Sequence, residues 1–337
     1  MKTIGIFPAS GGLGGSTYRH LLKLVQADKV ILISRHPEKT PQEYIDAGVQ
    51  TRQASYESSP SDLEAAFAGV DTLFLISYPS HVRDYRVKVQ LPAVDAAHRA
   101  GVSHIFYSSL AFAGEATSNH SLAEVMQAHL ATEAHLRQLA NDGNSPLSYT
   151  ILREGLYAES TPIYMAFFRP DQPPQQQQQP AEIRIPHDGS GPGIAWVARD
   201  ELGEASARLI ARYATTTTES DDDPAATTFP YINRTVLLTG TRVWSLADTV
   251  KVLAEIAGRR DLAIKQVSVD EYVQLPQVRA VFGPEEEKAR TWATAWDAVR
   301  AGETAVVTGE MEEILGRRPE DFEVAARKYW AENAVPS

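Results

Sequence analysis

The sequence of 337 residues contains no cysteine. Disulfides, thiolate metal sites and cysteine nucleophiles are therefore excluded. No apolar run approaches the roughly 20 residues of a membrane span, and the N-terminus does not have the pattern of a signal peptide. Basic residues are in deficit, because 32 Lys and Arg stand against 43 Asp and Glu, for a net charge of −11. This balance argues against a nucleic acid partner. We expect a protein without a membrane segment, located in the cytoplasm, with the nucleus as an additional location left open.

Short apolar runs alternate with helical patterns through the first half of the chain. A run such as TLFLI at 72–76 is apolar throughout, which is typical of a strand buried on both faces. Alternating strands and helices of these lengths predict an α/β fold with a doubly wound parallel sheet. The strands are expected at 3–7, 30–34, 51–54, 72–76, 104–108 and 149–152.

Several helices have readable ends. Ser61 with Glu64, and Ser121 with Glu124, have the spacing of capping boxes, and two glycines at 69 and 101 follow predicted helix ends. Two polar segments, 169–182 and 215–224, are predicted to be surface loops. Helices are expected at about 82–101, 121–139, 200–213 and 245–257, a late strand at 235–240, and a helical remainder at 260–337 with one strand near 263–267.

The stretch FPASGGLGGS, residues 7–16, lies between the first predicted strand and the first predicted helix. Pro8, Gly11 and Gly14 occupy the three positions of a G-x-x-G-x-x-G turn, which holds a pyrophosphate in dinucleotide-binding folds. Pro8 is a departure, since this position is usually glycine. The alternative is a plain turn between strand and helix. The predicted cofactor contacts here are Pro8, Ser10, Gly11, Gly12, Leu13 and Gly14.

The second strand ends in LISRHPEK. NAD-preferring folds have an acidic residue at this point, which binds the ribose hydroxyls. Here Ser34 occupies the position and Arg35 follows. A guanidinium without a carboxylate suits a 2′-phosphate, so the pattern favours NADP(H). The alternative is that Arg35 is an exposed residue at a strand end.

Further segments follow in order: GVDTLFLIS, AAHRAGVSHIFYSSL, HLATEAHLRQLA, SYTILREGLY, LTGTRVWSLADTVKVLAEIAGR and LGRRPEDFEVAARKYW. With the glycine turn and LISRHPEK, and over nearly the whole chain, the sequence resembles the NmrA-like family of atypical short-chain dehydrogenases/reductases. The HxxTE helix and the LR-x-G-x-Y turn resemble its branch of NADPH-dependent quinone reductases. Pro8 and the two polar segments depart from the usual pattern of that branch.

The resemblance implies an extended Rossmann domain with a smaller C-terminal α/β substrate lobe. We assign residues 1–158 plus about 192–258 to the NADP-binding domain, and about 159–191 plus 259–337 to the lobe. The same family contains dinucleotide-binding redox sensors without catalytic activity, and a transcription factor.

Ordinary short-chain dehydrogenases place a catalytic Tyr and Lys, four residues apart, on the helix after the fifth strand. The matching positions here are His129 and Glu133. They continue a stripe formed by Leu122, Met126, Leu136 and Ala140, so they are expected to face the sheet. A pair at this spacing can interact, and a neighbouring carboxylate would favour an imidazolium that donates a proton. The alternative is a hydrogen-bonded pair without a role in chemistry.

Other candidates lie at strand ends. Ser108 and Ser109 are expected to polarise a substrate carbonyl, or alternatively to cap a turn. Tyr157 is predicted to line the substrate cleft. Contacts with the cofactor ribose and carboxamide are assigned to Ile76, Ser77, Tyr78, Ser108, Glu133 and Gly155. The histidines show no spacing typical of a metal site.

Two classes of function remain. The first is an NADPH-dependent reductase of a small carbonyl electrophile, either a quinone or a ketone or enone of secondary metabolism. Quinone reduction suits a site without a strong acid, since the hydroquinonate product is a weak base. The second is a redox sensor that binds NADP(H) and regulates a protein partner, which the missing Tyr and Lys favour. The sequence leaves the oligomeric state open.

Overall fold

The computed structural model describes residues 1–142, 147–171, 182–216, 229–259 and 261–333. Within them, seven strands form one parallel sheet in the order β3-β2-β1-β4-β5-β6-β8. This is the doubly wound sheet that the alternating pattern predicts. Its strands are β1 (Ile4–Phe7), β2 (Val30–Ser34), β3 (Gln50–Gln53), β4 (Thr72–Ile76), β5 (His104–Leu110), β6 (Ser148–Glu154) and β8 (Arg234–Leu238).

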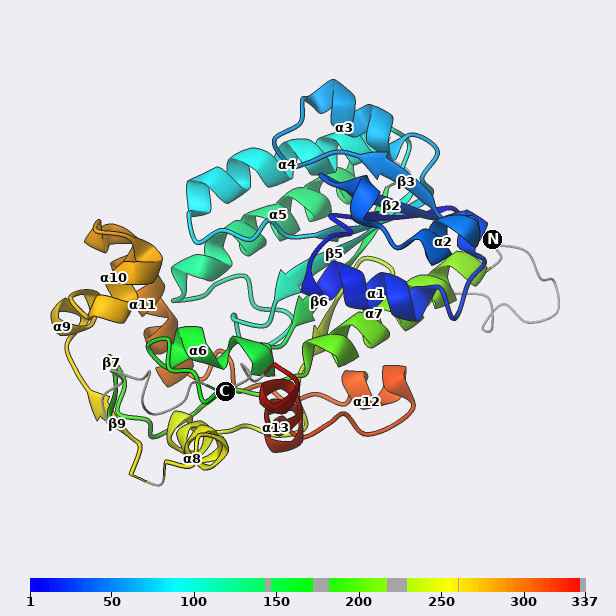
Figure 1. Ribbon diagram of the computed structural model, residues 1–337. Coiled ribbons are helices and arrows are strands. Elements are labelled where there is room, and N and C mark those ends of the chain that lie inside the picture. The colour runs from blue at the N-terminus through cyan, green and yellow to red at the C-terminus, as the bar shows by residue number, and fades with distance from the viewer. Residues whose placement is uncertain (143–146, 172–181, 217–228, 260, 334–337) are drawn as a thin grey trace.

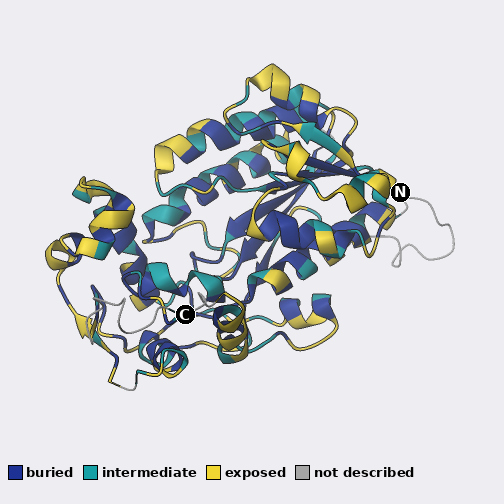
Figure 2. Ribbon diagram, viewed as in Figure 1, coloured by how far each residue is buried: buried dark blue, intermediate teal, exposed yellow. Residues whose placement is uncertain are grey.

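Helices cover both faces of the sheet, as Figure 1 shows. On one face lie α3 (Pro60–Phe67), α4 (Arg83–Arg99) and α5 (Glu124–Asn141), and on the other lie α1 (Gly12–Leu21) and α7 (Arg199–Thr215). Successive side chains of a strand point to opposite faces. The strands are therefore buried on both sides, and they appear as the dark interior of Figure 2.

The direction of the strand order reverses between β1 and β4, because β2 and β3 lie to one side of β1 and β4 and β5 lie to the other. All carboxyl ends of a parallel sheet lie at one edge. A crevice opens there where the order reverses, and this is the usual ligand site of such folds.

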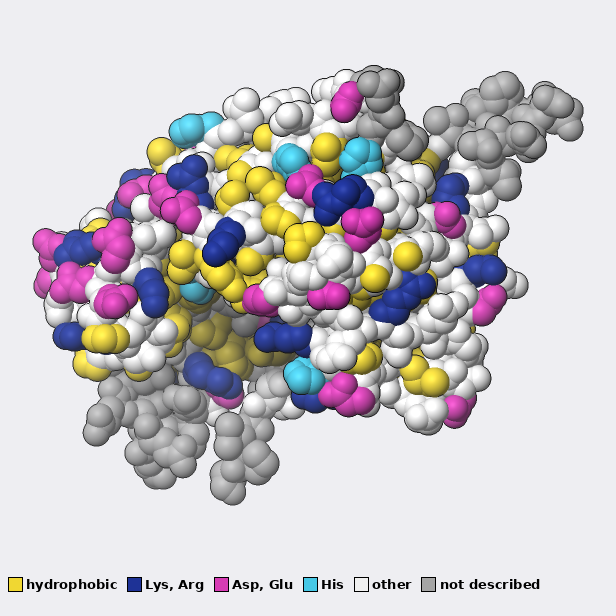
Figure 3. Space-filling model, turned by 90° about the horizontal axis from the view of Figure 1, so that it is seen from above, with side chains coloured by type: hydrophobic (Ala, Val, Ile, Leu, Met, Phe, Trp, Pro, Cys, Tyr) yellow, Lys and Arg dark blue, Asp and Glu magenta, His cyan; other side chains and the backbone are white. Residues whose placement is uncertain are grey.

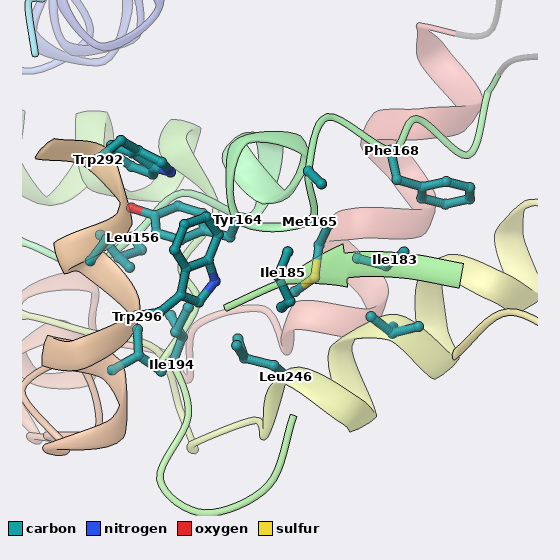
Figure 4. Packing of buried hydrophobic residues seen from close by; sticks show 14 of the residues in the cluster. Leu156, Tyr164, Met165, Phe168, Ile183, Ile185, Ile194, Leu246, Trp292 and Trp296 are labelled. Carbon is teal, nitrogen blue, oxygen red and sulfur yellow. The ribbon is translucent and has the colours of Figure 1, made fainter. Parts of the chain in front are cut away.

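The rest of the chain packs below this edge. β7 (Glu182–Ile185) and β9 (Ala263–Gln266) form a separate two-stranded parallel sheet. Trp292 and Trp296 of α11 point toward Tyr164 in a large aromatic and aliphatic core (Figure 4). The boundary between the domain and the lobe stays a prediction. The helices here are α6 (Thr161–Tyr164), α8 (Leu246–Ile256), α9 (Val269–Val273), α10 (Pro276–Phe282), α11 (Glu286–Arg300), α12 (Glu310–Leu315) and α13 (Phe322–Glu332); α2 (Gln42–Asp46) follows β2.

Both predicted capping boxes are wrong. The cap of α3 is Ser59, whose side chain accepts from the Asp62 N–H, rather than Ser61. Helix α5 begins at Glu124 without a side-chain cap, because Ser121 Oγ accepts from the Ala123 N–H and the Glu124 N–H donates to Thr294 Oγ1. In this chain, the sequence pattern Ser–x–x–Glu therefore occurs at two places without forming the capping box that it usually indicates.

Other differences concern the second half and the stripe of α5. Strand β7 was not expected, because it is short and pairs only with the distant β9. The polar segments predicted at 169–182 and 215–224 lie largely outside the described residues. Leu122, placed in the buried stripe, precedes the helix and is 46% exposed. None of the helices in the described ranges is long and apolar enough to cross a membrane.

His104 gives the fold a dependence on pH. Its ring nitrogens lie 2.7 Å from Ser148 Oγ and 3.0 Å from Thr150 Oγ1, and its ring stacks on Tyr213. Burial, together with the charge of Lys2, lowers the pKa of His104 to about 3. At pH values between about 3 and the ordinary pKa of 6.5, His104 is therefore protonated in the unfolded chain and neutral in the folded protein.

We expect the free energy of unfolding to fall by about 3 kcal/mol between pH 7 and pH 4 on account of His104. In His104→Asn this contribution disappears, so urea unfolding at the two pH values should show a smaller difference than in the wild type. An identical difference in both proteins would contradict the assignment.

Candidate functional site

A cavity of about 380 Å³ opens at the reversal point of the sheet. It lies where β1, β2, β3 and β4 end, so parallel strands bring distant segments of the chain to one place. Most predicted cofactor residues line it: Pro8, Ser10, Gly11, Gly12, Leu13, Gly14, Arg35, Ile76, Ser77 and Tyr78. The volume is within the range of small-molecule sites.

The glycines of the turn have separate structural reasons. Gly11 has a φ of +108°, and nothing lies within 4 Å of the place where a Cβ would be. The space in front of it is open for a ligand, and a side chain there would be strained. A Cβ on Gly14 would lie 2.7 Å from the Pro8 carbonyl oxygen, so glycine allows α1 to pack against the end of β1.

Arg199, which the sequence analysis did not single out, lies against the same turn. A Cβ on Gly12 would lie 2.5 Å from its Cζ, so the guanidinium is beside the first residue of α1. Within the described residues, no hydrogen bond or ion pair of this guanidinium is found. The positive end of a helix dipole repels a cation. An anion between them would turn this repulsion into attraction.

The end of β2 is basic. Ser34 is buried, and Arg35 is exposed beside the cavity. Arg35 also borders a second hollow of about 590 Å³, together with Arg52, Ser55 and other residues of the β3 end. Among the residues that line this hollow, the acidic one is Asp62, in the first turn of α3. No carboxylate occupies the strand end where a ribose ligand is expected.

Sequence reasoning missed the segment after β3. Ala54, Ser55, Tyr56 and Glu57 line the cavity, and the Tyr56 hydroxyl donates to the Ile76 carbonyl over 2.6 Å. The Glu57 carboxylate beside Tyr78 raises the pKa of that phenol to about 12. The sequence could have pointed to these residues only through their place after β3, because β3 is parallel to β2 and must end at the same edge of the sheet.

The prediction for His129 is wrong in two respects. Its side chain faces inward, but its partners are Tyr107, 3.1 Å from Nδ1, and Arg86, whose guanidinium lies 2.7 Å from Nε2. It does not pair with Glu133. Since a guanidinium only donates, Nε2 must accept and the ring is neutral. Burial and the charges of Arg86 and Arg153 lower the pKa of His129 well below its ordinary value, so an imidazolium donor is not supported.

Glu133 and Ser109 belong to a buried ion-pair network. Arg153 donates from Nε to Oε1 over 2.9 Å and from Nη2 to Oε2 over 2.7 Å. Ser109 donates to Oε1, and Arg137 donates to Oε2. Neither Glu133 nor Arg153 is exposed at all. This network joins α5, β5 and β6, and it occupies Glu133 and Ser109, two of the five side chains that were predicted to be catalytic.

The opposite face of the same strands carries a second polar group. Ser108, Glu154 and Tyr157 lie on the side of α1 and α7, and the Tyr157 hydroxyl donates to Glu154 Oε2 over 2.9 Å. Ser108, Tyr157, Glu133 and Gly155 are absent from the lining of the cavity. Gly155 instead packs closely, because a Cβ there would lie 3.0 Å from the Leu238 carbonyl oxygen.

Parallel sheet, reversal point and glycine turn together define a dinucleotide-binding protein of the Rossmann type. The model of the NAD(P)H-binding family matches residues 9–179. An NmrA-like family domain-containing oxidoreductase of Aspergillus flavus, flvB, is 31% identical over 96% of this chain and 94% of its own length. The chain therefore belongs to the NmrA-like family of NAD(P)H-binding oxidoreductases.

Solved structures agree on the fold. The triphenylmethane reductase of Citrobacter sp., complexed with NADP(H), is 26% identical with a TM-score of 0.70 over 97% of this chain and 99% of its own. The NADPH-dependent quinone oxidoreductase QOR2 of Escherichia coli is 23% identical, with a TM-score of 0.73 over 97% and 99%. The predicted fold, family and use of a nicotinamide dinucleotide are thus confirmed.

Removal of Arg153 tests the buried network. We expect Arg153→Met to lower the free energy of unfolding by about 3–5 kcal/mol, because Glu133 would stay buried without its main partner. Arg137→Met is the matched control, since Arg137 bonds the same carboxylate but is one-third exposed. Its loss should cost less than about 1 kcal/mol. Equal effects of the two variants in urea unfolding would contradict this account.

Proposed function

We propose that this protein is an NADPH-dependent reductase of a small carbonyl compound, either a quinone or a ketone or enone of secondary metabolism. The observation that carries the cofactor part is the cavity at the glycine turn, bordered by Arg35 with no acid at the end of β2. Membership in the oxidoreductase family supports the reaction class.

The chain offers a separate place for each part of the cofactor. The start of α1 would hold the pyrophosphate in the open space before Gly11, and Arg199, whose guanidinium lies beside Gly12, would add positive charge to this end of the helix. Arg35 and Arg52, beside the second hollow, would hold the 2′-phosphate. The nicotinamide would then extend past Ile76 and Ser77 toward the carboxyl ends of β5 and β6, where the bound cofactor supplies hydride.

A substrate would approach this end from the side of the C-terminal helices. Figure 3 shows a hollow lined by apolar side chains between the part with α9–α11 and the part with the seven-stranded sheet. His81, just before α4, packs its ring 5.5 Å from Phe282 and 5.3 Å from Trp292 and so connects the two parts. Val82, which follows His81 in the chain, and Val281, which precedes Phe282, are exposed. Such surroundings suit a flat, largely apolar carbonyl compound.

The sensor remains the second candidate. It is favoured by the fact that His129 and Glu133 are both engaged by protein partners, so neither position that is catalytic in ordinary short-chain dehydrogenases holds a free acid. One experiment decides between the classes. The protein is mixed with NADPH and a panel of quinones, ketones and enones, and nicotinamide absorbance is followed. We expect turnover; tight binding of NADPH with no turnover on any member would establish the sensor.

Two arginines separate the parts of the cofactor site. We expect Arg35→Ala to weaken NADPH binding by about 1–3 kcal/mol and to leave NADH nearly unchanged, because only NADPH carries the 2′-phosphate. Arg199→Gln should weaken NADPH and NADH by similar factors, because both contain the pyrophosphate. Affinities are measured by fluorescence titration of each variant with both cofactors. An equal loss for NADPH and NADH in Arg35→Ala would refute the assignment of Arg35.

A further inference from the structure

We propose that Glu154 is the acid of this site and that its Oε1 holds the proton which a reduced carbonyl oxygen takes up. Tyr157 acts as a positioning residue through Oε2. This inference rests on the proposed reductase function and deepens it, since it names the proton donor and the kind of carbonyl that needs one.

Glu154 is the last residue of β6, between Leu110 of β5 and Leu238 of β8. It is 1% exposed, and its side chain lies on the face of α1 and α7, opposite to the Glu133 network. Oε1 is buried and has no hydrogen-bond partner among the described residues; the Ser108 hydroxyl is near enough to lower the pKa of the carboxyl but makes no hydrogen bond with it. A buried polar atom of this kind requires an explanation, and a ligand that is bound during function is one.

The hydrogen bond from Tyr157 decides which oxygen carries the proton. Because the phenol donates to Oε2, a neutral carboxyl places its own proton on Oε1. Burial raises the pKa of Glu154 to about 8, against the smaller opposing effects of the Tyr157 and Ser108 hydroxyls. An acid whose pKa is close to the working pH is well suited to donate a proton and to regain it.

The other charged groups near this point do not compete for the role. Glu159 accepts the Arg199 backbone N–H with both oxygens, and the Arg199 guanidinium lies over Gly12. Burial and Glu154 raise the pKa of Tyr157 well above its ordinary value. Arg199, which lowers this pKa, and Glu159, which raises it, have smaller effects. The phenol is therefore a weaker acid than Glu154 and stays protonated.

Glu154 does not line the cavity, and in the proposed site it lies beyond the cavity, on the path assigned to the nicotinamide half of the cofactor. Ile76 lines the cavity and is level with Ser108 and Leu152 in neighbouring strands. Glu154 is two residues farther toward the carboxyl edge of β6. The distance from β4 to β6 is two strand spacings, about 10 Å. The half of a dinucleotide that extends beyond the cavity is long enough to cover it.

The step balances with one acid and one reductant. The carbonyl carbon gains a hydride, with its electron pair, from reduced cofactor, and the C=O π bond becomes a lone pair on oxygen. That oxygen takes the proton from Oε1, so the O–H bond of Glu154 breaks and a carboxylate remains. Water returns a proton to Glu154 afterwards. The carbonyl is reduced and the nicotinamide is oxidised by two electrons.

The first test needs neither cofactor nor turnover. Infrared spectra of the free protein are recorded in a pH series through about 8. We expect a protonated carboxyl band that disappears as the pH rises, that is absent in Glu154→Gln, and that persists in Glu159→Gln. In Tyr157→Phe the band should persist to higher pH, because the carboxylate has lost a donor. Absence of the band in the wild type, or its retention in Glu154→Gln, would overturn the proposal.

The second test compares two substrate classes in the same variant. An alkoxide is a strong base, whereas a hydroquinonate is a weak one. Glu154→Gln should therefore lower kcat for ketones by about 10²-fold to 10⁴-fold and change kcat for quinones much less. The affinity for NADPH should be unchanged, which shows that the variant is folded.

The outcomes separate the two levels of the argument. If the wild type reduces no member of the panel, the proposed function fails, whatever the infrared spectra show. If the wild type reduces ketones and Glu154→Gln reduces them at the same rate with the same pH profile, the assignment of Glu154 fails and the reductase stands. A ketone-specific loss in Glu154→Gln supports both.

Discussion

The buried pair of Glu133 and Arg153 determines how the polar groups at the carboxyl edge are divided. An unpaired charge in this interior would cost several kcal/mol, so both side chains must stay together. The bidentate contact between Arg153 and Glu133, with Ser109 and Arg137 added, joins α5 to β5 and β6. Arg153 also donates to the carbonyls of Glu115 and Ser118 and so holds the loop that follows β5. One face of the edge is thereby committed to structure.

The opposite face contains two polar groups that have no hydrogen-bond partner among the described residues. They are Glu154 Oε1 and the guanidinium of Arg199 at the start of α1. Neighbouring residues of one strand, Arg153 and Glu154, thus have opposite roles because a strand turns successive side chains to opposite faces. The same holds for Ser109 and Ser108 in β5. The sites that chemistry can use are those where the fold has not already satisfied the polar atoms.

This division explains which parts could be predicted from the sequence. Most strands, the helices between them and the turn at Gly11 and Gly14 follow from local patterns, namely apolar runs, periodicity and glycine spacing. The cavity residues after β3 and β4 follow from parallel topology. Partners of His129 could not be predicted, because Arg86 is 43 residues away in the chain and reaches it only through the packing of α4 against α5. The catalytic positions of ordinary short-chain dehydrogenases indicate where to look in this chain. The chemistry of the residues found there is decided by their hydrogen-bond partners.

At the proposed site, the carboxyl group of Glu154 would lie near a cofactor that carries several negative charges. An ionised Glu154 would repel the phosphates, whereas a neutral one does not, and burial keeps it neutral below about pH 8. In the proposed reaction, the oxidised nicotinamide would carry a positive charge. This charge, together with the Tyr157 hydroxyl, would favour the carboxylate that remains when the proton has left. Glu154 would then be neutral with reduced cofactor and stabilised as an anion with oxidised cofactor, which is the order that the proposed carbonyl reduction requires.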